Sequence, residues 1–248
     1  MDRPNVAIVT GAGSGIGRAA ALMLAREGYA VVLVGRDRGR LESVAAEIAA
    51  GSTTAPAGSA HVVPADLSTP EGNEQMVAAA VERFGRLDVL VNNAGWSPLV
   101  SVADADGATV RRIFEINALA PVWATRAAWG ALTDAKAAAS RVRSACIVNV
   151  SSTASVDPFP GLGVYGAAKA AVNTLTRATA SEGAAAGLRA FAVAPGAVET
   201  GLLRSLFDEQ MVPRERCLQP EDVAGVIVDC VLGAYDGRSG ETVMVPSP

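Results

Sequence analysis

A tyrosine and a lysine lie one helical turn apart, at Tyr165 and Lys169, in a stretch whose pattern predicts a helix over Val164–Ala186. A free phenol has a pKa of ~10 and is a poor proton donor or acceptor at neutral pH. An ammonium group one turn away would stabilise the phenolate and lower the pKa of the tyrosine. We therefore interpret Tyr165 as a candidate general acid or base. A core tyrosine beside a solvated lysine is the structural alternative.

A glycine-rich turn follows the first predicted strand. The apolar run Val6–Thr10 leads into Gly11-Ala-Gly-Ser-Gly-Ile-Gly17 and then into a stretch of helix formers, Arg18–Glu27. A strand–turn–helix of this kind brings backbone N–H groups and the positive end of a helix dipole against a pyrophosphate, and glycine allows the close approach. The spacing is G-x-x-x-G-x-G, because Ile16 stands where the common G-x-G-x-x-G pattern has its last glycine. We predict a dinucleotide-binding turn, with a plain tight turn as the alternative.

Strand-like and helix-like stretches alternate along the chain. This alternation predicts an α/β, doubly wound (Rossmann-like) fold, with a mostly parallel seven-stranded sheet and helices on both faces. The expected strands are Val6–Thr10, Ala30–Gly35, His61–Pro64, Leu87–Val91, Ala145–Val150, Leu188–Ala194 and Thr242–Val245.

Glycine and proline predict several helix ends. Gly28 and Gly51 should end the first two helices, and Pro220 should open the last one. The segment Ser68–Glu71 has the pattern of a capping box. The tract Gly51–Ala60, rich in small and polar residues, predicts a surface loop within a single domain.

Composition limits the classes of function. The 248 residues, 50% of them hydrophobic, can bury one large core, so we expect a single domain over residues 1–248. A net charge of −4 and 4% aromatic residues argue against a nucleic-acid partner. Because no apolar run reaches the ~20 residues of a membrane span and the first strand begins at residue 6, we expect a soluble cytoplasmic protein without a signal peptide.

Histidine and cysteine usage argues against other chemistries. His61 is the only histidine, which leaves no material for a Ser-His-Asp hydrolase or a histidine-ligated metal site. Cys146, Cys217 and Cys230 are odd in number and widely separated, so they suit packing better than disulfides or thiolate ligands. We expect no metal centre.

Together these motifs resemble the short-chain dehydrogenase/reductase family, nearly from end to end. The resemblance implies one doubly wound domain, a bound nicotinamide dinucleotide, and hydride transfer between a carbonyl and a secondary alcohol. It also implies a homo-oligomer, either a tetramer or a dimer. The matching positions are Thr10–Gly17, Asp66, Asn92–Gly95, Asn117, Ser152, Tyr165, Lys169 and Pro195–Gly196.

The resemblance assigns four catalytic residues. Tyr165 would give or take the proton on the substrate oxygen, and Ser152 would position that oxygen. The thirteen-residue offset to Tyr165 selects Ser152 over its neighbour Ser151. Lys169 would bind the nicotinamide ribose and lower the pKa of the tyrosine, and Asn117 would hold a water that links Lys169 to solvent. Without the family, Asn117 would be interpreted as a capping or kink residue.

The resemblance also implies a set of cofactor contacts. They come from the glycine turn, from the ends of the second to fourth strands, from the catalytic helix and from the segment after the sixth strand. The expected residues are Gly11, Ser14, Gly15, Ile16, Gly17, Arg36, Asp66, Leu67, Asn92, Ala94, Gly95, Tyr165, Lys169, Pro195, Gly196, Val198 and Thr200.

The end of the second strand indicates which cofactor is preferred. NAD enzymes usually have an acidic residue where this chain has Gly35. Arg36, together with Arg38, could instead pair with a 2′-phosphate, for which a guanidinium has the better geometry. Asp37 nearby, and Ser14 in place of a basic residue, argue the other way. We expect NADP (NADPH), with NAD as the alternative.

Apolar side chains indicate the substrate. The segment 196–219 should fold over the pocket as a lid, and a small hydrophobic or acyl-chain carbonyl fits best, 3-oxoacyl thioesters included. Trp96 suits a pocket wall or local packing equally. The tail Val245–Pro248 lacks the Asp-Gly-Gly that often follows the last strand in the family, which puts tail-mediated subunit contacts in doubt. The expected substrate-pocket residues are Trp96, Ser152, Phe159, Leu162, Leu202 and Leu206.

Two other functions stay open. A non-catalytic NADP-binding redox sensor would use the same fold, but such proteins typically lose the tyrosine or the lysine. An epimerase or dehydratase of the extended branch would have a longer chain with a substrate domain. All four catalytic positions are filled here, which favours an enzyme.

Overall fold

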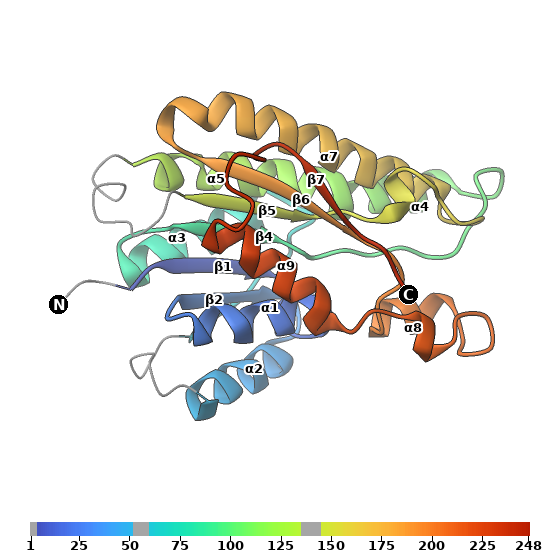
Figure 1. Cartoon of the computed structure of the whole chain (residues 1–248), viewed down its shortest axis with the longest axis horizontal. Coiled ribbons are helices and arrows are strands. Elements are labelled where there is room, and N and C mark those ends of the chain that lie inside the picture. Colours follow the sequence, from blue (N-terminus) through green and yellow to red (C-terminus); the bar gives the residue numbers. More distant parts are fainter. Residues whose placement is uncertain (1–3, 52–59, 135–144) are drawn as a thin grey trace.

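One parallel sheet runs through the molecule. The computed structural model describes residues 4–51, 60–134 and 145–248. In this part of the chain seven strands pair in the order β3-β2-β1-β4-β5-β6-β7, and every neighbouring pair is parallel (Figure 1). The strands are β1 (Val6–Thr10), β2 (Ala30–Gly35), β3 (Ala60–Pro64), β4 (Val89–Asn92), β5 (Cys146–Val150), β6 (Arg189–Pro195) and β7 (Thr242–Val245).

Helices cover both faces of this sheet. One core lies between the sheet and α1 (Gly15–Arg26), α2 (Arg38–Gly51) and α9 (Pro220–Leu232). The opposite face packs against three other helices. Because both faces are covered, the central strands are continuous apolar runs, and β1 is buried at every position. The helices of the opposite face are α3 (Pro70–Phe84), α5 (Ala120–Thr133) and α7 (Gly163–Gly183).

Strand order reverses between β1 and β4. Chain crossovers leave this point in opposite directions, so a crevice forms at the carboxyl ends of the two strands. Two short helices, α4 (Gly107–Phe114) and α8 (Gly201–Leu206), lie near this edge of the sheet, on the right of Figure 1. The residues with the chemistry predicted above follow the same strand ends.

The close approach of α7 to the segment after β5 requires a glycine. A Cβ added at Gly166 would stand 2.2 Å from the carbonyl oxygen of Ala154. Ala154 belongs to a single turn of 3₁₀-helix, Thr153–Ser155, that directly follows Ser152. Gly166 therefore sets the distance between the helix that contains Tyr165 and the turn that contains Ser152.

The predicted fold class is confirmed, and every predicted strand lies within two residues of the observed one. Gly28 follows α1 with a φ of +85°, and Gly51 is the last residue of α2. Pro220 opens α9. Of the predicted loop Gly51–Ala60, residues 52–59 lie outside the described part of the chain, so the structure does not test it.

The capping box predicted over Ser68–Glu71 is wrong by one residue. The N-cap of α3 is Thr69, whose hydroxyl accepts the N–H of Gly72 at 3.2 Å. Pro70 is the first helical residue, and its fixed φ suits that position, so the cap must be residue 69. Ser68 instead donates its hydroxyl to Asp66 at 2.8 Å.

Three further observations bear on the sequence expectations. No helix in the described ranges is long and apolar enough to cross a membrane. Cys146, Cys217 and Cys230 are free and buried, as packing residues are. Among the described residues, no three histidine, cysteine or acidic side chains form a group that could hold a metal ion.

We expect Gly166→Ala to lower the melting temperature by roughly 2–12 °C, because overpacking costs about 1–3 kcal/mol and each kcal/mol shifts a domain of this size by a few degrees. Gly225→Ala is the matched control. No described atom beyond its own turn of α9 lies within 4 Å of that added Cβ, so the better helix propensity of alanine should raise the melting temperature. Thermal unfolding of both variants measures this. Equal stability of Gly166→Ala and parent would show that α7 does not need the glycine.

Candidate active site

Two adjoining cavities lie at the carboxyl edge of the sheet. The first, about 390 Å³, extends from the start of α1 past Tyr165 to α8; we call it the Tyr165 cavity. The second, about 810 Å³, lies between the end of β2, Asp66 and α4; we call it the Asp66 cavity. They form one groove across the point where strand order reverses, which is where open α/β sheets bind ligands. Four residues line both cavities: Gly11, Ser14, Ala94 and Gly95.

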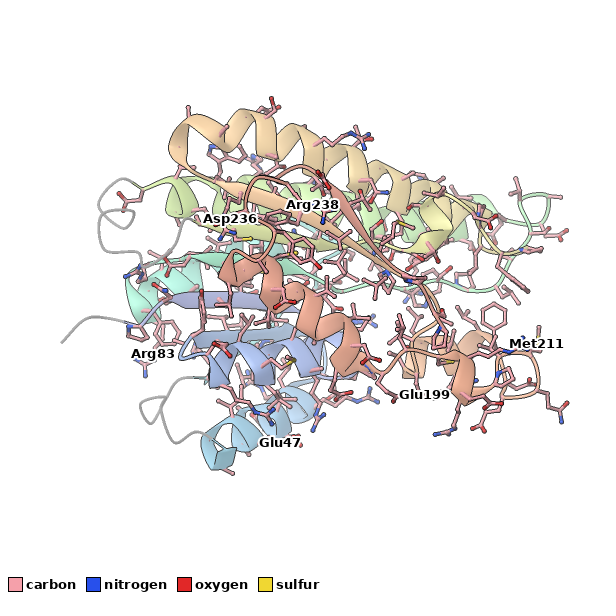
Figure 2. The ribbon with its side chains drawn as sticks, in the orientation of Figure 1. Glu47, Arg83, Glu199, Met211, Asp236 and Arg238 are labelled. Atoms are coloured by element: carbon pink, nitrogen blue, oxygen red, sulfur yellow. The ribbon has the colours of Figure 1, made fainter. Side chains whose placement is uncertain are left out.

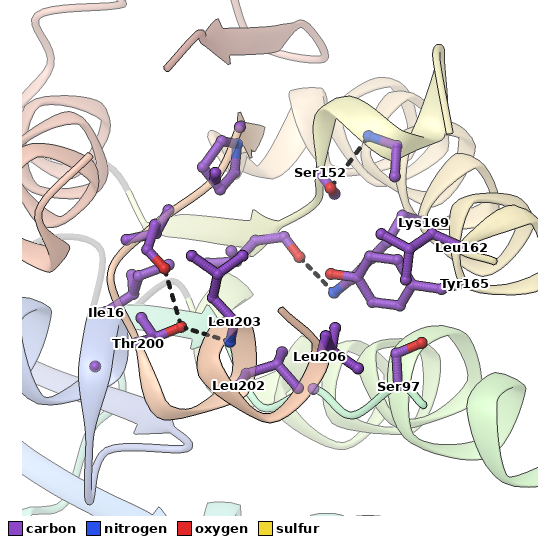
Figure 3. Close-up of a pocket in the computed structure, with 18 of the residues that line it drawn as sticks. Ile16, Ser97, Ser152, Leu162, Tyr165, Lys169, Thr200, Leu202, Leu203 and Leu206 are labelled. Carbon is purple, nitrogen blue, oxygen red and sulfur yellow. Dashed lines mark hydrogen bonds between the residues drawn. The ribbon is translucent and has the colours of Figure 1, made fainter. Parts of the chain in front are cut away.

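Tyr165, Lys169 and Ser152 meet on one wall of the Tyr165 cavity (Figure 3). The Lys169 Nζ lies 5.6 Å from the centre of the Tyr165 ring and donates a hydrogen bond to the carbonyl oxygen of Val150 at 2.7 Å. The Ser152 hydroxyl acts on Tyr165 closely enough to lower the pKa of the phenol. Because the Ser152 Oγ accepts the N–H of Ala154 at 3.1 Å, its own proton is available for the tyrosine oxygen.

The neighbouring serine has a different role. Ser151 is buried, and its hydroxyl donates to the carbonyl oxygen of Lys169 at 3.3 Å. It therefore helps to fix α7 on the end of β5. The serine that acts on the pKa of Tyr165 is Ser152, the one that the family offset selects.

Burial is the main cause of the pKa shifts of Tyr165 and Lys169. It raises the pKa of Tyr165 to about 12, although the Ser152 hydroxyl opposes the rise. Burial also lowers the pKa of Lys169 to about 8. The pKa of Tyr165 is therefore raised in the protein alone and not lowered as expected, because burial disfavours the charged phenolate.

Asn117 lies in a single turn of π-helix, Glu115–Leu119, between α4 and α5. Its amide accepts the N–H of Trp96 at 3.2 Å and donates to the carbonyl oxygens of Trp96 and Ile113 at 2.6 and 2.8 Å. A Cβ on Gly95 would stand 3.0 Å from the Asn117 Oδ1 and 3.9 Å from the Lys169 Nζ. Asn117 thus fixes the segment after β4 close to the lysine. Its water-holding role stays a prediction.

Most of the expected cofactor residues line the groove. Gly17 and Asn92 line neither cavity. A Cβ at Gly17 would stand 2.3 Å from the Gly11 carbonyl oxygen, so this glycine lets α1 close on the turn. The Asn92 Nδ2 donates to the Asn149 Oδ1 at 2.8 Å within the sheet.

The other expected cofactor residues divide between the two cavities. The Asp66 cavity contains Arg36, Asp66 and Leu67. The Tyr165 cavity contains Gly11, Ser14, Gly15, Ile16, Ala94, Gly95, Tyr165, Lys169, Pro195, Gly196, Val198 and Thr200.

The middle of the groove fits the pyrophosphate of a dinucleotide. Ser14 is the N-cap of α1, and its side chain makes no capping hydrogen bond. The N-terminal amides of α1 therefore keep their capacity to bind an anion. Gly11 and Gly15 have φ values of +65° and +52°, which favour glycine. A Cβ at Gly15 would also stand 3.0 Å from the Thr200 Cγ2, so a larger residue would narrow the groove.

The outer end of the groove contains both basic and acidic side chains. Arg36 and Arg40 line the Asp66 cavity, whereas Arg38 pairs with Glu42 at 3.6 Å on the first turn of α2. The Asp37 carboxylate accepts the Arg40 N–H at 3.1 Å and pairs with its guanidinium at 3.2 Å. Arg38 therefore does not line the groove, and its contact with a 2′-phosphate stays a prediction. Arg40 is the second cation there, which the sequence analysis missed because only the start of α2 orients it.

The substrate side of the site is apolar. Figure 3 shows Leu202 and Leu206 of α8 across the cavity from Tyr165. Ser152, Phe159 and Leu162 complete this part of the lining. These are five of the six expected pocket residues.

Trp96, the sixth, lies elsewhere. It lines the Asp66 cavity, where the Arg112 guanidinium stacks over its ring at 4.4 Å. The prediction that Trp96 forms a wall of the substrate pocket is not met. Its side chain turns toward α4, because its backbone N–H and carbonyl are both held by Asn117.

Besides Arg40, the sequence analysis assigned no role to Asn93 and Ser247, which hold the backbone near the site. The Asn93 Nδ2 donates to the Thr10 carbonyl oxygen at 2.8 Å and so fixes the start of the glycine turn. The Ser247 Oγ accepts the N–H of Ala197 at 2.7 Å, although fifty positions separate the two residues. The Asn92–Gly95 motif could have indicated Asn93. No local pattern could have indicated Ser247.

Comparisons with known proteins agree with this geometry. A model of the family described as short chain dehydrogenase matches residues 5–211. An uncharacterized oxidoreductase of Methylorubrum extorquens is 35% identical over 96% of this chain and 94% of its own length. The crystal structure of 3-ketoacyl-(acyl-carrier-protein) reductase from Brucella melitensis complexed with NADH has a TM-score of 0.87 and 32% identity, and covers 99% of this chain and 98% of that one. The alcohol dehydrogenase from the archaeon Thermococcus sibiricus, complexed with 5-hydroxy-NADP, has a TM-score of 0.83 and 29% identity, with 98% and 96% covered.

Lys169 should give the cofactor-free protein a measurable pH dependence of stability. Its pKa is about 8 in the folded protein against an ordinary 10.5, so between these values the unfolded chain binds more protons and the free energy of unfolding rises with pH. Lys169→Met lacks this contribution. The stability of the parent relative to Lys169→Met should therefore increase by about 2 kcal/mol between about pH 8 and 9.5.

Chemical denaturation of both proteins across this pH range measures the difference. Tyr165 does not interfere, because its raised pKa lowers stability only as the pH rises above its ordinary value of 10.0. A difference between parent and variant that stays constant with pH would show that the ammonium group is not desolvated.

Proposed function

This chain belongs to the short-chain dehydrogenase family, and on that premise we propose that it is an NAD(P)(H)-dependent oxidoreductase that interconverts a carbonyl and a secondary alcohol by hydride transfer. One observation carries the proposal: Ser152, Tyr165 and Lys169 form one wall of a cavity that continues past an uncapped helix N-terminus. The fold alone would support many functions, but this arrangement supplies proton transfer beside a dinucleotide groove.

When bound, the nicotinamide supplies or accepts the hydride. The Tyr165 hydroxyl gives a proton to the carbonyl oxygen during reduction and takes it back during oxidation. The Ser152 hydroxyl donates a hydrogen bond to the same oxygen. The Val150 carbonyl directs the Lys169 ammonium toward the groove, where it is placed to bind ribose hydroxyls and to stabilise the phenolate as it forms. The amides at Gly15 and Ile16 would hold the pyrophosphate.

We further propose NADP as the preferred cofactor. Arg36 and Arg40 lie at the end of the Asp66 cavity, where the adenosine ribose would be held. Gly35 supplies no carboxylate for the ribose hydroxyls, and the Asp37 carboxylate is already paired with Arg40. The two solved relatives contain NADH and an NADP analogue, so the family uses both cofactors.

The substrate proposed here is a small hydrophobic or acyl-chain carbonyl, with 3-oxoacyl thioesters as one candidate group. The proposed lid, residues 196–219, contributes Leu202 and Leu206 to the cavity opposite Tyr165. The cytoplasmic location and the tetrameric or dimeric state stay predictions from the sequence.

A panel of aldehydes, ketones and 3-oxoacyl thioesters with NADPH and NADH tests the proposal, followed at the nicotinamide absorbance band. Turnover of any carbonyl supports an oxidoreductase. Tight binding of NADPH without turnover of any carbonyl or alcohol would favour the second candidate function, a redox sensor.

Tyr165→Phe should lower kcat by at least ~10²-fold and leave cofactor affinity near the parental value, because it removes one hydroxyl and leaves the glycine turn intact. Tyr235→Phe is the matched control. Tyr235 lines neither cavity, so this variant should keep parental activity. Steady-state kinetics with cofactor titration measure both quantities. A Tyr165→Phe enzyme with near-parental kcat would refute the assigned proton transfer.

Arg36→Ala should raise the KM for NADPH by roughly 10–100-fold and barely change that for NADH, because a charge-assisted hydrogen bond contributes about 1.5–3 kcal/mol. Adding Gly35→Asp should invert the preference. The added Cβ would meet Leu41 at an ordinary 3.5 Å, so the change should not disturb the fold. Arg38→Ala is the control, since Arg38 pairs with Glu42 outside the cavity lining. If these variants changed the KM for NADPH and for NADH equally, another group would be the one that contacts the adenosine ribose and sets the preference.

A further inference from the structure

On the substrate side of the Tyr165 cavity, away from the start of α1, the described residues offer an anionic substrate no cation besides Lys169. Among the described residues that line it, the charged ones are Lys169 and Asp157. The Lys169 ammonium already donates to the Val150 carbonyl and lies against Tyr165. Asp157 is exposed in the segment between β5 and α7, so its negative charge faces a substrate that enters the cavity. A carboxylate or phosphate on this side of the cavity would meet repulsion without a further compensating cation.

Two of the three basic side chains of the proposed lid are neutralised within the lid itself, and the third, Arg216, is exposed. Arg204 forms an ion pair with Glu199 and also donates to the Val212 carbonyl oxygen at 2.8 Å. Arg214 pairs with Glu209 at 2.7 Å. These guanidinium groups therefore hold the lid in shape and offer little attraction to an anionic carrier that approaches the mouth.

Exposed apolar side chains instead lie on the three segments that line this side of the cavity, and we call them the apolar rim. Nine large apolar side chains are exposed in the described part of the chain, and five of them belong to these three segments. Such a gathering usually marks a binding surface. The rim consists of Leu99, Val102, Val156, Phe159 and Met211, with exposed fractions from 42% to 74%.

Contacts connect these segments at one end of the molecule. A Cβ at Gly161 would stand 2.7 Å from the Leu99 Cδ1, and one at Gly163 would stand 3.0 Å from the Val102 Cγ2. The residues after β4 therefore pack against the residues before α7. Met211 lies on the lid, at the same end of the molecule (Figure 2).

The rim is continuous with the cavity that ends at Tyr165. Phe159 belongs to both, and its ring meets the ring of Phe207 edge to face at 5.2 Å. Phe207 also lines the cavity. The ligand that covers the rim can therefore be the same molecule that places its carbonyl at Tyr165.

We propose that the substrate is an uncharged, lipophilic carbonyl compound or the corresponding alcohol, whose apolar part extends from Tyr165 over the apolar rim. An acyl group on an anionic carrier, such as coenzyme A or an acidic carrier protein, is disfavoured. This inference rests on the proposed oxidoreductase function and narrows its substrate class.

Matched substrates test the charge part of this proposal. A 3-oxoacyl group is offered to the NADPH-loaded enzyme as the neutral N-acetylcysteamine thioester and as the anionic coenzyme A thioester. We expect kcat/KM to favour the neutral form by at least tenfold at low salt, and the ratio to shrink as salt screens the repulsion. Asp157→Asn should shrink it several-fold, whereas Asp229→Asn, an exposed carboxylate on α9 that lines neither cavity, should leave it unchanged.

A series of methyl ketones tests the apolar part. Each added CH₂ should raise kcat/KM by up to roughly fourfold until the rim is covered, as burial of a methylene predicts. The double variant Val102→Ser with Val156→Ser should flatten this dependence for the longer ketones. Val81→Ser, an exposed valine on α3, is the control and should keep the parental slope.

The outcomes separate the two proposals. The proposal that the substrate is uncharged is overturned if the coenzyme A thioester is turned over as well as the neutral thioester or better. It is also overturned if neither salt nor Asp157→Asn changes the ratio of the two kcat/KM values. A chain-length dependence that is absent, or unaffected by the double variant, overturns the apolar part. Absence of turnover with every carbonyl would instead refute the oxidoreductase function itself.

Discussion

A single buried lysine constrains the whole site. Lys169 is 3% exposed, and its ammonium is held by the carbonyl oxygen of Val150, the last residue of β5. Ser152 follows two residues later, so one strand end fixes both the lysine and the serine. Helix α7 can bring Tyr165 close to these two residues because Gly166 has no side chain. A polar group this deep in the protein is tolerated because its hydrogen bond is made within the fold.

Further polar contacts behind this wall hold the turn that contains Ser152. The Ser155 hydroxyl donates to the Ser152 carbonyl oxygen at 2.7 Å, and the Asn173 Nδ2 donates to that same Ser155 hydroxyl at 2.9 Å. Asn173 lies one helical turn after Lys169. The helix that contains the acid–base pair therefore also positions the serine, and the three side chains form one rigid unit.

The sequence predicted the layers and most of the groove because both follow from local patterns. Apolar runs and glycine turns indicate where strands end, and the carboxyl ends of parallel strands lie at one edge of the sheet. Arg40 and Trp96 were placed wrongly or missed because the direction of a side chain depends on tertiary contacts, such as the Asn117 amide that turns Trp96 away. The direction of the Tyr165 pKa shift was wrong for a related reason: sequence spacing gives the neighbours of a group but not its burial.

The proposed lid is anchored at both ends, because the chain around Val198 pairs with Leu218 and the start of the lid bonds to the C-terminal tail. The N–H of Gly196 donates to the Val245 carbonyl oxygen at 2.9 Å, and that of Ala197 to the Ser247 hydroxyl at 2.7 Å. The pairing of Arg204 with Glu199 then ties α8 to the chain just before it. The contact of Phe207 with Phe159, between two side chains on separate segments, has no backbone hydrogen bond of this kind. Separation of these two rings would therefore let the proposed lid open without the loss of a backbone hydrogen bond between them, and their contact keeps water from this side of Tyr165.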